Sequence, residues 1–170
     1  MKDIEHAVKI LKTAIEAEKE SLLAYLEFAR KVKDEAGKNM FIKLGIDEFE
    51  HINLFEKQLE DLCSKRACSD VEIKGSEIEK LVPRLDELEK ENGLSGIDDV
   101  SALKTALELE KRGIEYYSEQ AEKSQDKFIS SMFKRLVEME QSHYDLILAE
   151  LDYIEKTGFW FNVLGFTGAY

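Results

Sequence analysis

"LKTAIEAEKESLLAYLEFA" at residues 11–29 returns as "LKTALELEKRGIEYYSEQA" at residues 103–121, with ten identities in nineteen positions. Both segments place apolar residues three or four positions apart, which is the spacing of an amphipathic helix. The two segments lie 92 residues apart in the chain. A repeat of this length predicts an internal duplication, in which two copies of a helical unit are related by a pseudo-twofold axis.

The same offset of 92 residues relates the segments that follow the two copies. "IDEFEHINLF" at residues 46–55 corresponds to "EMEQSHYDLI" at residues 138–147, and Phe41 corresponds to Phe133. The repeated unit is therefore longer than one helix. We interpret it as a pair of long helices, present twice.

Four helices are predicted from this pattern. A short turn around residues 34–38, which contains Gly37, joins the first two, and another around residues 124–126 joins the last two. Short connections make antiparallel neighbours. Asp98 or Asp99 is a plausible N-cap for the third helix, and the fourth is expected to stop before the glycine at 158. The predicted helices cover residues 3–34, 39–65, 98–123 and 127–156.

A long connection separates the two helical hairpins. Residues 66–97 can travel the length of a bundle, so that the second and third helices run parallel, as in ferritin-like four-helix bundles. A further short helix is predicted around Pro83. We therefore expect an all-α, internally duplicated bundle, a single ferritin-like domain over residues 1–170. Its parts are a hairpin (3–65), a crossover (66–97), a second hairpin (98–156) and an aromatic tail (157–170).

The charge and hydropathy of the chain limit its partners. It has 24 basic and 36 acidic residues, for a net charge of −12. Such a surface repels nucleic acids and anionic membranes. No apolar run reaches the ~18 residues of a membrane span, and the N-terminal "MKDIEHAVKI" is amphipathic rather than typical of a signal peptide. We expect no nucleic acid, no membrane and a cytoplasmic location.

Glu48 and His51 interrupt the apolar stripe of the second predicted helix, and their copies Glu140 and His143 interrupt that of the fourth. Residues three apart lie on one face of a helix, about 5–6 Å apart at Cβ. A carboxylate and an imidazole at that spacing can bind one metal ion or a bridged pair. Taken alone, an E-x-x-H sequence is common on helices, so its presence in both copies carries the argument.

Glu18 and Glu110 interrupt the stripes of the first and third predicted helices and are related by the same offset. Alone, each is explained equally well by a side chain that reaches out to solvent. Together, four buried carboxylates are costly without a cation, whereas two divalent ions cancel their charge. Ferritin-like dimetal proteins use this ligand set. The predicted ligands are Glu18, Glu48, His51, Glu110, Glu140 and His143; those predicted at the surface are His6, Glu16, Glu20, Glu50, Glu108 and Glu138.

Tyr25 and Tyr117 lie seven residues beyond Glu18 and Glu110, on the same helix faces. One interpretation is that they are core aromatics. The other is that each hydrogen-bonds a ligand carboxylate of the facing helix and so supports the metal site.

These residues together resemble the rubrerythrin branch of the ferritin-like superfamily. The resemblance rests on Glu18 with Tyr25, Glu110 with Tyr117 and the two E-x-x-H sequences, and it covers the four helices. It implies two iron ions, with Glu48 and Glu140 as bridging ligands and Glu18 and Glu110 as terminal ones. It further implies an oxidoreductase of oxidative stress that reduces hydrogen peroxide or oxygen, or oxidises ferrous iron, in a homodimer or larger homo-oligomer.

The chain departs from the rubrerythrin pattern in two ways. Rubrerythrins carry a rubredoxin domain with four cysteines, whereas this chain has only Cys63 and Cys68, so we expect a separate rubredoxin-like electron donor. Rubrerythrins also have an extra carboxylate one turn after the third-helix ligand. Gly113 stands there in this chain, and Ser21 is its counterpart in the first helix.

Several alternatives stay open from the sequence. The metal is manganese or zinc instead of iron in one alternative, because helix spacing does not select the ion. In another, the protein is a ferroxidase that serves iron storage or detoxification; a purely structural bundle is the plainest. Cys63 and Cys68 are either ordinary thiols or a redox pair. The aromatic tail either caps the bundle, which we favour, or enters a subunit contact.

Overall fold

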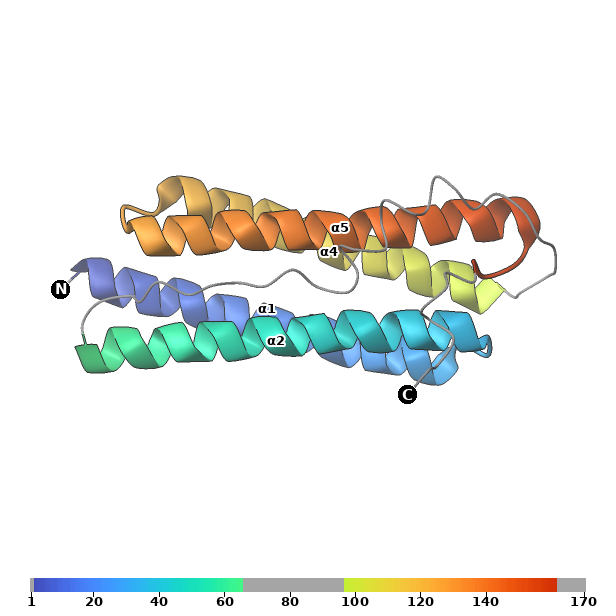
Figure 1. The fold of residues 1–170 in the computed structure, drawn as a ribbon, viewed down its shortest axis with the longest axis horizontal. Helices are drawn as coiled ribbons and strands as arrows, with labels where there is room; N and C mark the ends of the chain where they lie inside the picture. The colour runs from blue at the N-terminus through green and yellow to red at the C-terminus, as the bar shows by residue number, and fades with distance from the viewer. Residues whose placement is uncertain (1, 66–96, 162–170) are drawn as a thin grey trace.

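The computed structural model describes residues 2–65 and 97–161, which form four long helices. No strand occurs in these two ranges, and the predicted all-α bundle is confirmed (Figure 1). The helices are α1 (Lys2–Lys31), α2 (Glu35–Lys65), α4 (Ile97–Lys123) and α5 (Lys127–Thr157).

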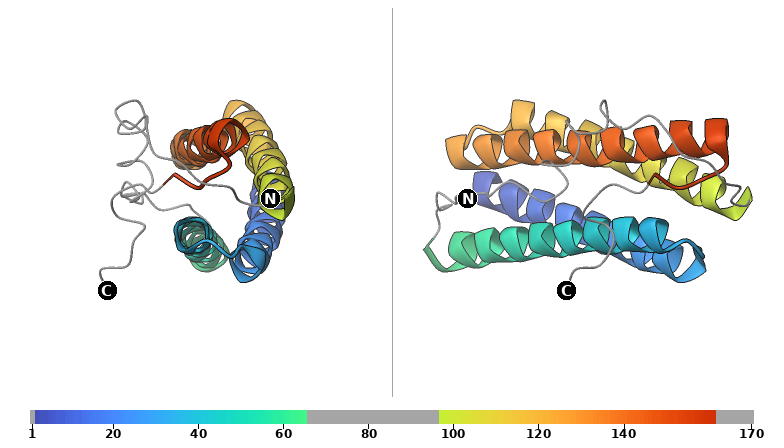
Figure 2. Two further views of the ribbon diagram at one scale, coloured as in Figure 1. Left: turned by 90° about the vertical axis from the view of Figure 1, so that its right-hand side faces the viewer. Right: turned by 45° about the vertical axis from the view of Figure 1, so that its right-hand side comes forward.

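The helices follow the ferritin-like order of directions. Each hairpin, α1 with α2 and α4 with α5, is an antiparallel pair packed along its length. The C-terminal end of α2 and the N-terminal end of α4 lie at opposite ends of the bundle, so α2 and α4 run parallel (Figure 1). The hairpins meet through α1 and α4, which lie next to each other along one side of the bundle (Figure 2). The crossover and the short helix predicted around Pro83 lie outside the described residues.

Aspartates 92 residues apart start the second helix of each hairpin. The Asp34 carboxylate accepts hydrogen bonds from the backbone N–H of Ala36 (2.8 Å) and Gly37 (3.4 Å). Asp126 accepts them from Phe128 (2.9 Å) and Ile129 (3.1 Å). A side-chain acceptor satisfies backbone donors that a helix N-terminus leaves free. The predicted start of α2 at residue 39 is therefore too late, and Gly37 belongs to the first turn of the helix.

Three other helix ends complete the comparison with the sequence. The predicted end of the first helix at residue 34 is too late, because α1 ends at Lys31 and Asp34 already accepts from the first turn of α2. The prediction that Asp98 or Asp99 caps the third helix is wrong, because α4 already begins at Ile97. At the end of α5, Gly158 adopts a left-handed conformation (φ 79°) and its N–H donates to the Ile154 carbonyl at 2.7 Å. Glycine tolerates this conformation, and it is a common helix stop.

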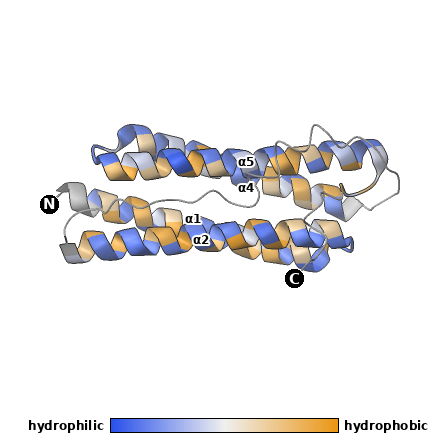
Figure 3. Ribbon diagram, in the orientation of Figure 1, coloured by the Kyte–Doolittle hydropathy of each residue, from blue (hydrophilic) through white to orange (hydrophobic). Residues whose placement is uncertain are grey.

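The buried apolar residues form two clusters, one toward each end of the bundle. Phe41 belongs to the first and Phe133 to the second, although the two are equivalent in the repeat. The same holds for Tyr25 and Tyr117. The pseudo-twofold axis thus exchanges the clusters, and the predicted metal ligands lie between them. Figure 3 shows the alternation of hydrophobic and hydrophilic residues along each helix that this packing requires.

The start of the aromatic tail folds back onto the bundle. Trp160 is 6% exposed, packs edge-on against Phe41 with ring centroids 5.9 Å apart, and donates from Nε1 to Asp99 Oδ2 at 2.9 Å. The backbone N–H of Phe161 donates to Glu150 Oε2 at 3.0 Å. Within the described residues the tail therefore caps the bundle, as the favoured interpretation expected. Residues 162–170 lie outside them.

Among the helices of the described ranges, none combines the length and the apolar character that a membrane span requires.

Gly37→Ala tests the packing of Trp160, at the start of the aromatic tail, against α2. Alanine normally stabilises a helix interior over glycine by about 1 kcal/mol, but a Cβ at Gly37 would lie 2.5 Å from the Trp160 ring. We expect the substitution to lower the free energy of unfolding in urea. In a Trp160→Ala background the obstruction is gone, and the same substitution should be neutral or stabilising. Equal effects in both backgrounds would contradict this packing.

Glu150→Gln tests the other tail contact. Burial raises the pKa of Glu150 to about 8, and the nearby Asp34 adds to the rise. The folded protein therefore holds a proton that the unfolded chain has lost, and stability must fall as the pH rises from about 4.5 to about 8. Glutamine keeps the acceptor for Phe161. We expect the variant to lose up to ~1.4 kcal/mol per pH unit of this dependence; an unchanged pH profile of unfolding would rule the assignment out.

Candidate metal centre

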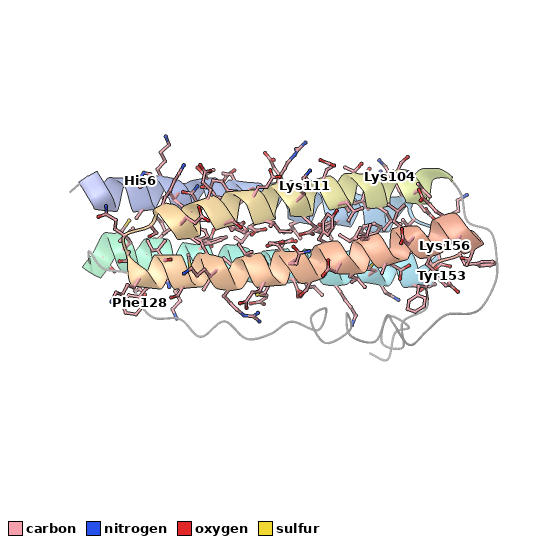
Figure 4. The ribbon with its side chains drawn as sticks, turned by 90° about the horizontal axis from the view of Figure 1, so that it is seen from above. His6, Lys104, Lys111, Phe128, Tyr153 and Lys156 are labelled. Carbon is pink, nitrogen blue, oxygen red and sulfur yellow. The ribbon has the colours of Figure 1, made fainter. Side chains whose placement is uncertain are left out.

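Each helix sends one carboxylate into the layer between the apolar clusters, and α2 and α5 each add a histidine. All six predicted ligands lie there, and none is more than 3% exposed. Glu16, Glu20, Glu50, Glu108 and Glu138 are exposed as predicted, and so is His6 near the N-terminus of α1. Figure 4 shows Lys111 projecting away from the bundle, whereas its neighbour Glu110 is buried.

The six side chains form two groups that share two members. One group is Glu18, Glu48, His51 and Glu140, and the other is Glu48, Glu110, Glu140 and His143; in each, the candidate ligand atoms lie within 4.8 Å of one another. Each group therefore contains one histidine, one glutamate of its own and the two shared glutamates. This is the arrangement that two adjacent ions with bridging carboxylates require.

The distances around the two imidazoles are nearly equal. Nδ1 of His51 lies 3.0 Å from Glu48, 3.2 Å from Glu140 and 3.4 Å from Glu18. Nδ1 of His143 lies 3.4 Å from Glu140, 3.5 Å from Glu48 and 3.6 Å from Glu110. The pseudo-twofold symmetry of the repeat thus extends to the ligand atoms.

Tyr25 and Tyr117 support the carboxylates of the opposite hairpin. The Tyr25 hydroxyl donates to Glu110 Oε1, and the Tyr117 hydroxyl donates to Glu18 Oε1. Both rings also stack in the core, against Phe41 and Phe133. The structure therefore contains both features that the sequence left as alternatives. Because the hydrogen bonds run between α1 and α4, they join the two hairpins where these contact each other.

The charges of the centre are unbalanced without a cation. Burial raises the pKa of Glu18 and Glu110 well above the usual glutamate range. Burial also acts to raise that of Glu48 and Glu140, but the two neighbouring histidines outweigh it and lower both pKa values. Burial acts to lower the pKa of His51 and His143, yet the surrounding carboxylates raise it well above normal. Without a metal ion, bound protons therefore have to neutralise the negative charge of the four carboxylates.

The unpartnered atoms of the centre fit a metal as well. Glu48 Oε1, Glu140 Oε1 and His143 Nδ1 are buried without a hydrogen-bond partner among the described residues. Buried polar atoms are normally paired, and these three belong to the groups of possible ligands. Oxygen and imidazole donors suit iron, manganese and zinc. The residues present therefore fit two divalent ions.

A cavity of about 190 Å³ lies between α1 and α4 beside the centre. Glu18, Glu110 and Glu140 line its inner part, and the exposed Glu20 and Arg112 line its outer part. Gly113 also lines it, and a Cβ there would lie 3.7 Å from Glu140. The cavity therefore offers a small molecule a path from the surface to the carboxylates.

Sequence reasoning missed Asp47, whose Oδ2 lies 3.1 Å from Nε2 of His143. The repeat gave no signal for it, because the residue 92 positions later is Met139. It also gave no reason to notice Glu150, which is buried with 1% of its surface exposed. Cys63 is an exposed free thiol, and Cys68 lies outside the described residues.

Comparisons with known proteins agree with this fold. The family model described as Rubrerythrin matches residues 9–151. One similar solved structure is a two-domain protein from Anabaena variabilis with DJ-1/ThiJ/PfpI-like and ferritin-like domains. It is 20% identical, with a TM-score of 0.66, and the match covers 88% of this chain and 40% of that one. At that identity it shows the fold. No curated protein matches.

Metal binding should stabilise the protein. A ligand that binds only the folded state adds about 2.7 kcal/mol at a hundred times its dissociation constant. We expect ferrous iron, manganese or zinc, added to metal-free protein without oxygen, to raise the thermal midpoint. Glu48→Gln and Glu140→Gln should lose most of this increment, and the exposed Glu50→Gln should keep it. An increment of equal size in all four proteins would show that the ions bind elsewhere.

Proposed function

The chain belongs to the rubrerythrin family, and we propose that it is a di-iron oxidoreductase that reduces hydrogen peroxide, or oxygen, with electrons from a separate donor. The observation that carries the proposal is the pair of ligand groups that share Glu48 and Glu140. Two ions held so close can act on both oxygens of one small molecule.

The residues divide naturally between two iron positions. Glu18 and His51 would hold one ion, Glu110 and His143 the other, and Glu48 and Glu140 would bind both. Four carboxylates balance the charge of two ferrous ions. When bound, two irons would supply one electron each, which matches the reduction of one hydrogen peroxide and two protons to two water molecules.

The protein's own contribution is to position the carboxylates and to limit the access of water. Tyr117 and Tyr25 hold the carboxylates of Glu18 and Glu110 in place by hydrogen bonds. The apolar clusters on both sides keep bulk water from reaching the centre along the bundle axis. The cavity between α1 and α4 is too small for a large substrate but admits peroxide or oxygen. Its Gly113 leaves open the space where the family resemblance implies an additional carboxylate.

Further partners belong to the same proposal. The two cysteines of this chain cannot provide the four thiolates of a rubredoxin-type iron site. We propose a separate rubredoxin-like protein as the source of the electrons. We also propose a cytoplasmic protein that works as a homodimer or larger homo-oligomer. Metal analysis of the purified protein distinguishes iron from the alternatives, manganese and zinc.

Anaerobic titration of the ferrous protein tests the reaction. We expect two irons to bind per chain. One hydrogen peroxide per two irons should oxidise them completely, and stopped-flow absorbance measures the rate of this oxidation. Glu110→Ala should slow this oxidation at least tenfold, whereas the exposed Glu108→Ala on the same helix should leave it unchanged.

Other outcomes of this titration separate the alternatives. Continued uptake beyond two irons per chain, with formation of a mineral, would favour iron storage over peroxide reduction. A ferrous centre that reacts with neither peroxide nor oxygen would exclude the proposed activity.

A further inference from the structure

The two histidines of the centre are held differently. His143 has its Nε2 3.1 Å from Oδ2 of Asp47, which reaches across from α2. A neutral imidazole carries one proton, so an acceptor at Nε2 keeps the proton there and leaves the Nδ1 lone pair free. Nδ1 is the atom that faces the glutamates. Asp47 therefore sets both the tautomer and the orientation of His143.

His51 lacks this support. Its Nε2 is buried and has no hydrogen-bond partner among the described residues. The residue equivalent to Asp47 is Met139, which is 4% exposed in α5. A thioether is only a weak acceptor and carries no charge. Within residues 2–65 and 97–161, no acceptor comparable to the aspartate therefore holds the proton of His51 on Nε2, away from the centre.

Apart from the Asp47 contact, the two groups of candidate ligands have the same composition. Each group has one glutamate of its own, one tyrosine that donates to that glutamate, and the same two shared glutamates. Asp47 also adds a carboxylate beside the His143 group, whereas its counterpart in the repeat, Met139, carries no charge. The contrast between Asp47 and Met139 thus bears on one ion position and not on the other.

We propose that Asp47 is a positioning residue that makes the two ion positions unequal. The position of Glu110 and His143 binds a divalent ion more tightly and fills first, and the position of Glu18 and His51 binds the more labile ion. This inference rests on the metal centre of the proposed function but not on the reaction. Carboxylates that hold a metal-bound histidine are typically worth 10–100-fold in metal affinity, so we expect a difference of about that size.

Stepwise titration of the metal-free protein with cobalt(II), followed by calorimetry and visible absorption, tests the inference. Two neighbouring cations repel each other, so even equal positions would fill in two steps; the comparison of variants is therefore decisive. Asp47→Met makes both sides alike and should weaken the tight step by about 10–100-fold. Met139→Asp should strengthen the weak step instead. In both variants the two dissociation constants should draw closer together.

Location and controls complete the experiment. With one cobalt per chain, anomalous scattering from crystals should place the ion beside His143 in the wild type. Asp47→Asn should weaken the tight step, whereas Glu50→Gln, which removes the same charge from an exposed position of α2, should change neither step. If Met139→Asp does not fold, Asp47→Met alone decides.

Two results would overturn the inference. In the first, Asp47→Met still binds two ions and both dissociation constants stay within twofold of the wild-type values. The proposed metal centre would survive that result. The other is a wild type that binds no ion, which would remove the centre and this inference together.

Discussion

Four carboxylates buried in one layer are the constraint on which the rest of the bundle depends. Each charge removed from water has to be neutralised or protonated, and every helix contributes one of them. The apolar clusters above and below the layer provide the hydrophobic stabilisation that such a centre lacks. The centre in turn supplies contacts between hairpins that otherwise meet through α1 and α4. Fold and site are thus parts of one arrangement.

Most of this arrangement could be predicted from one repeat. The offset of 92 residues pairs Glu18 with Glu110 and both E-x-x-H sequences, and the spacing of apolar residues places all of them on inward faces. Burial of the six ligands follows from that periodicity alone. The helix starts were harder to predict from the sequence. Asp34 resembles an ordinary loop residue until the structure shows its carboxylate accepting from the first helical N–H groups.

The features that the sequence could not reveal are those that break the repeat. Asp47 has Met139 as its counterpart, and Gly37, which makes room for Trp160, has Ile129. A repeat detects what two copies share, so residues that serve one copy only are invisible to it. Glu150 escaped notice for a related reason: its partner is the backbone of Phe161 in the tail, which follows the second hairpin alone. Such pairings become apparent only when the chain is folded.

The shared glutamates have a consequence for the way the halves are connected. Each group of candidate ligands takes three side chains from one hairpin and one from the other, with Glu48 and Glu140 as the residues exchanged. Two separate copies of one hairpin would have to find each other in solution and would be identical at every position. A single chain keeps the halves at a high effective concentration. It also lets equivalent positions of the two halves differ, with Asp47 in one and Met139 in the other, a difference that a symmetric homodimer of hairpins could never acquire.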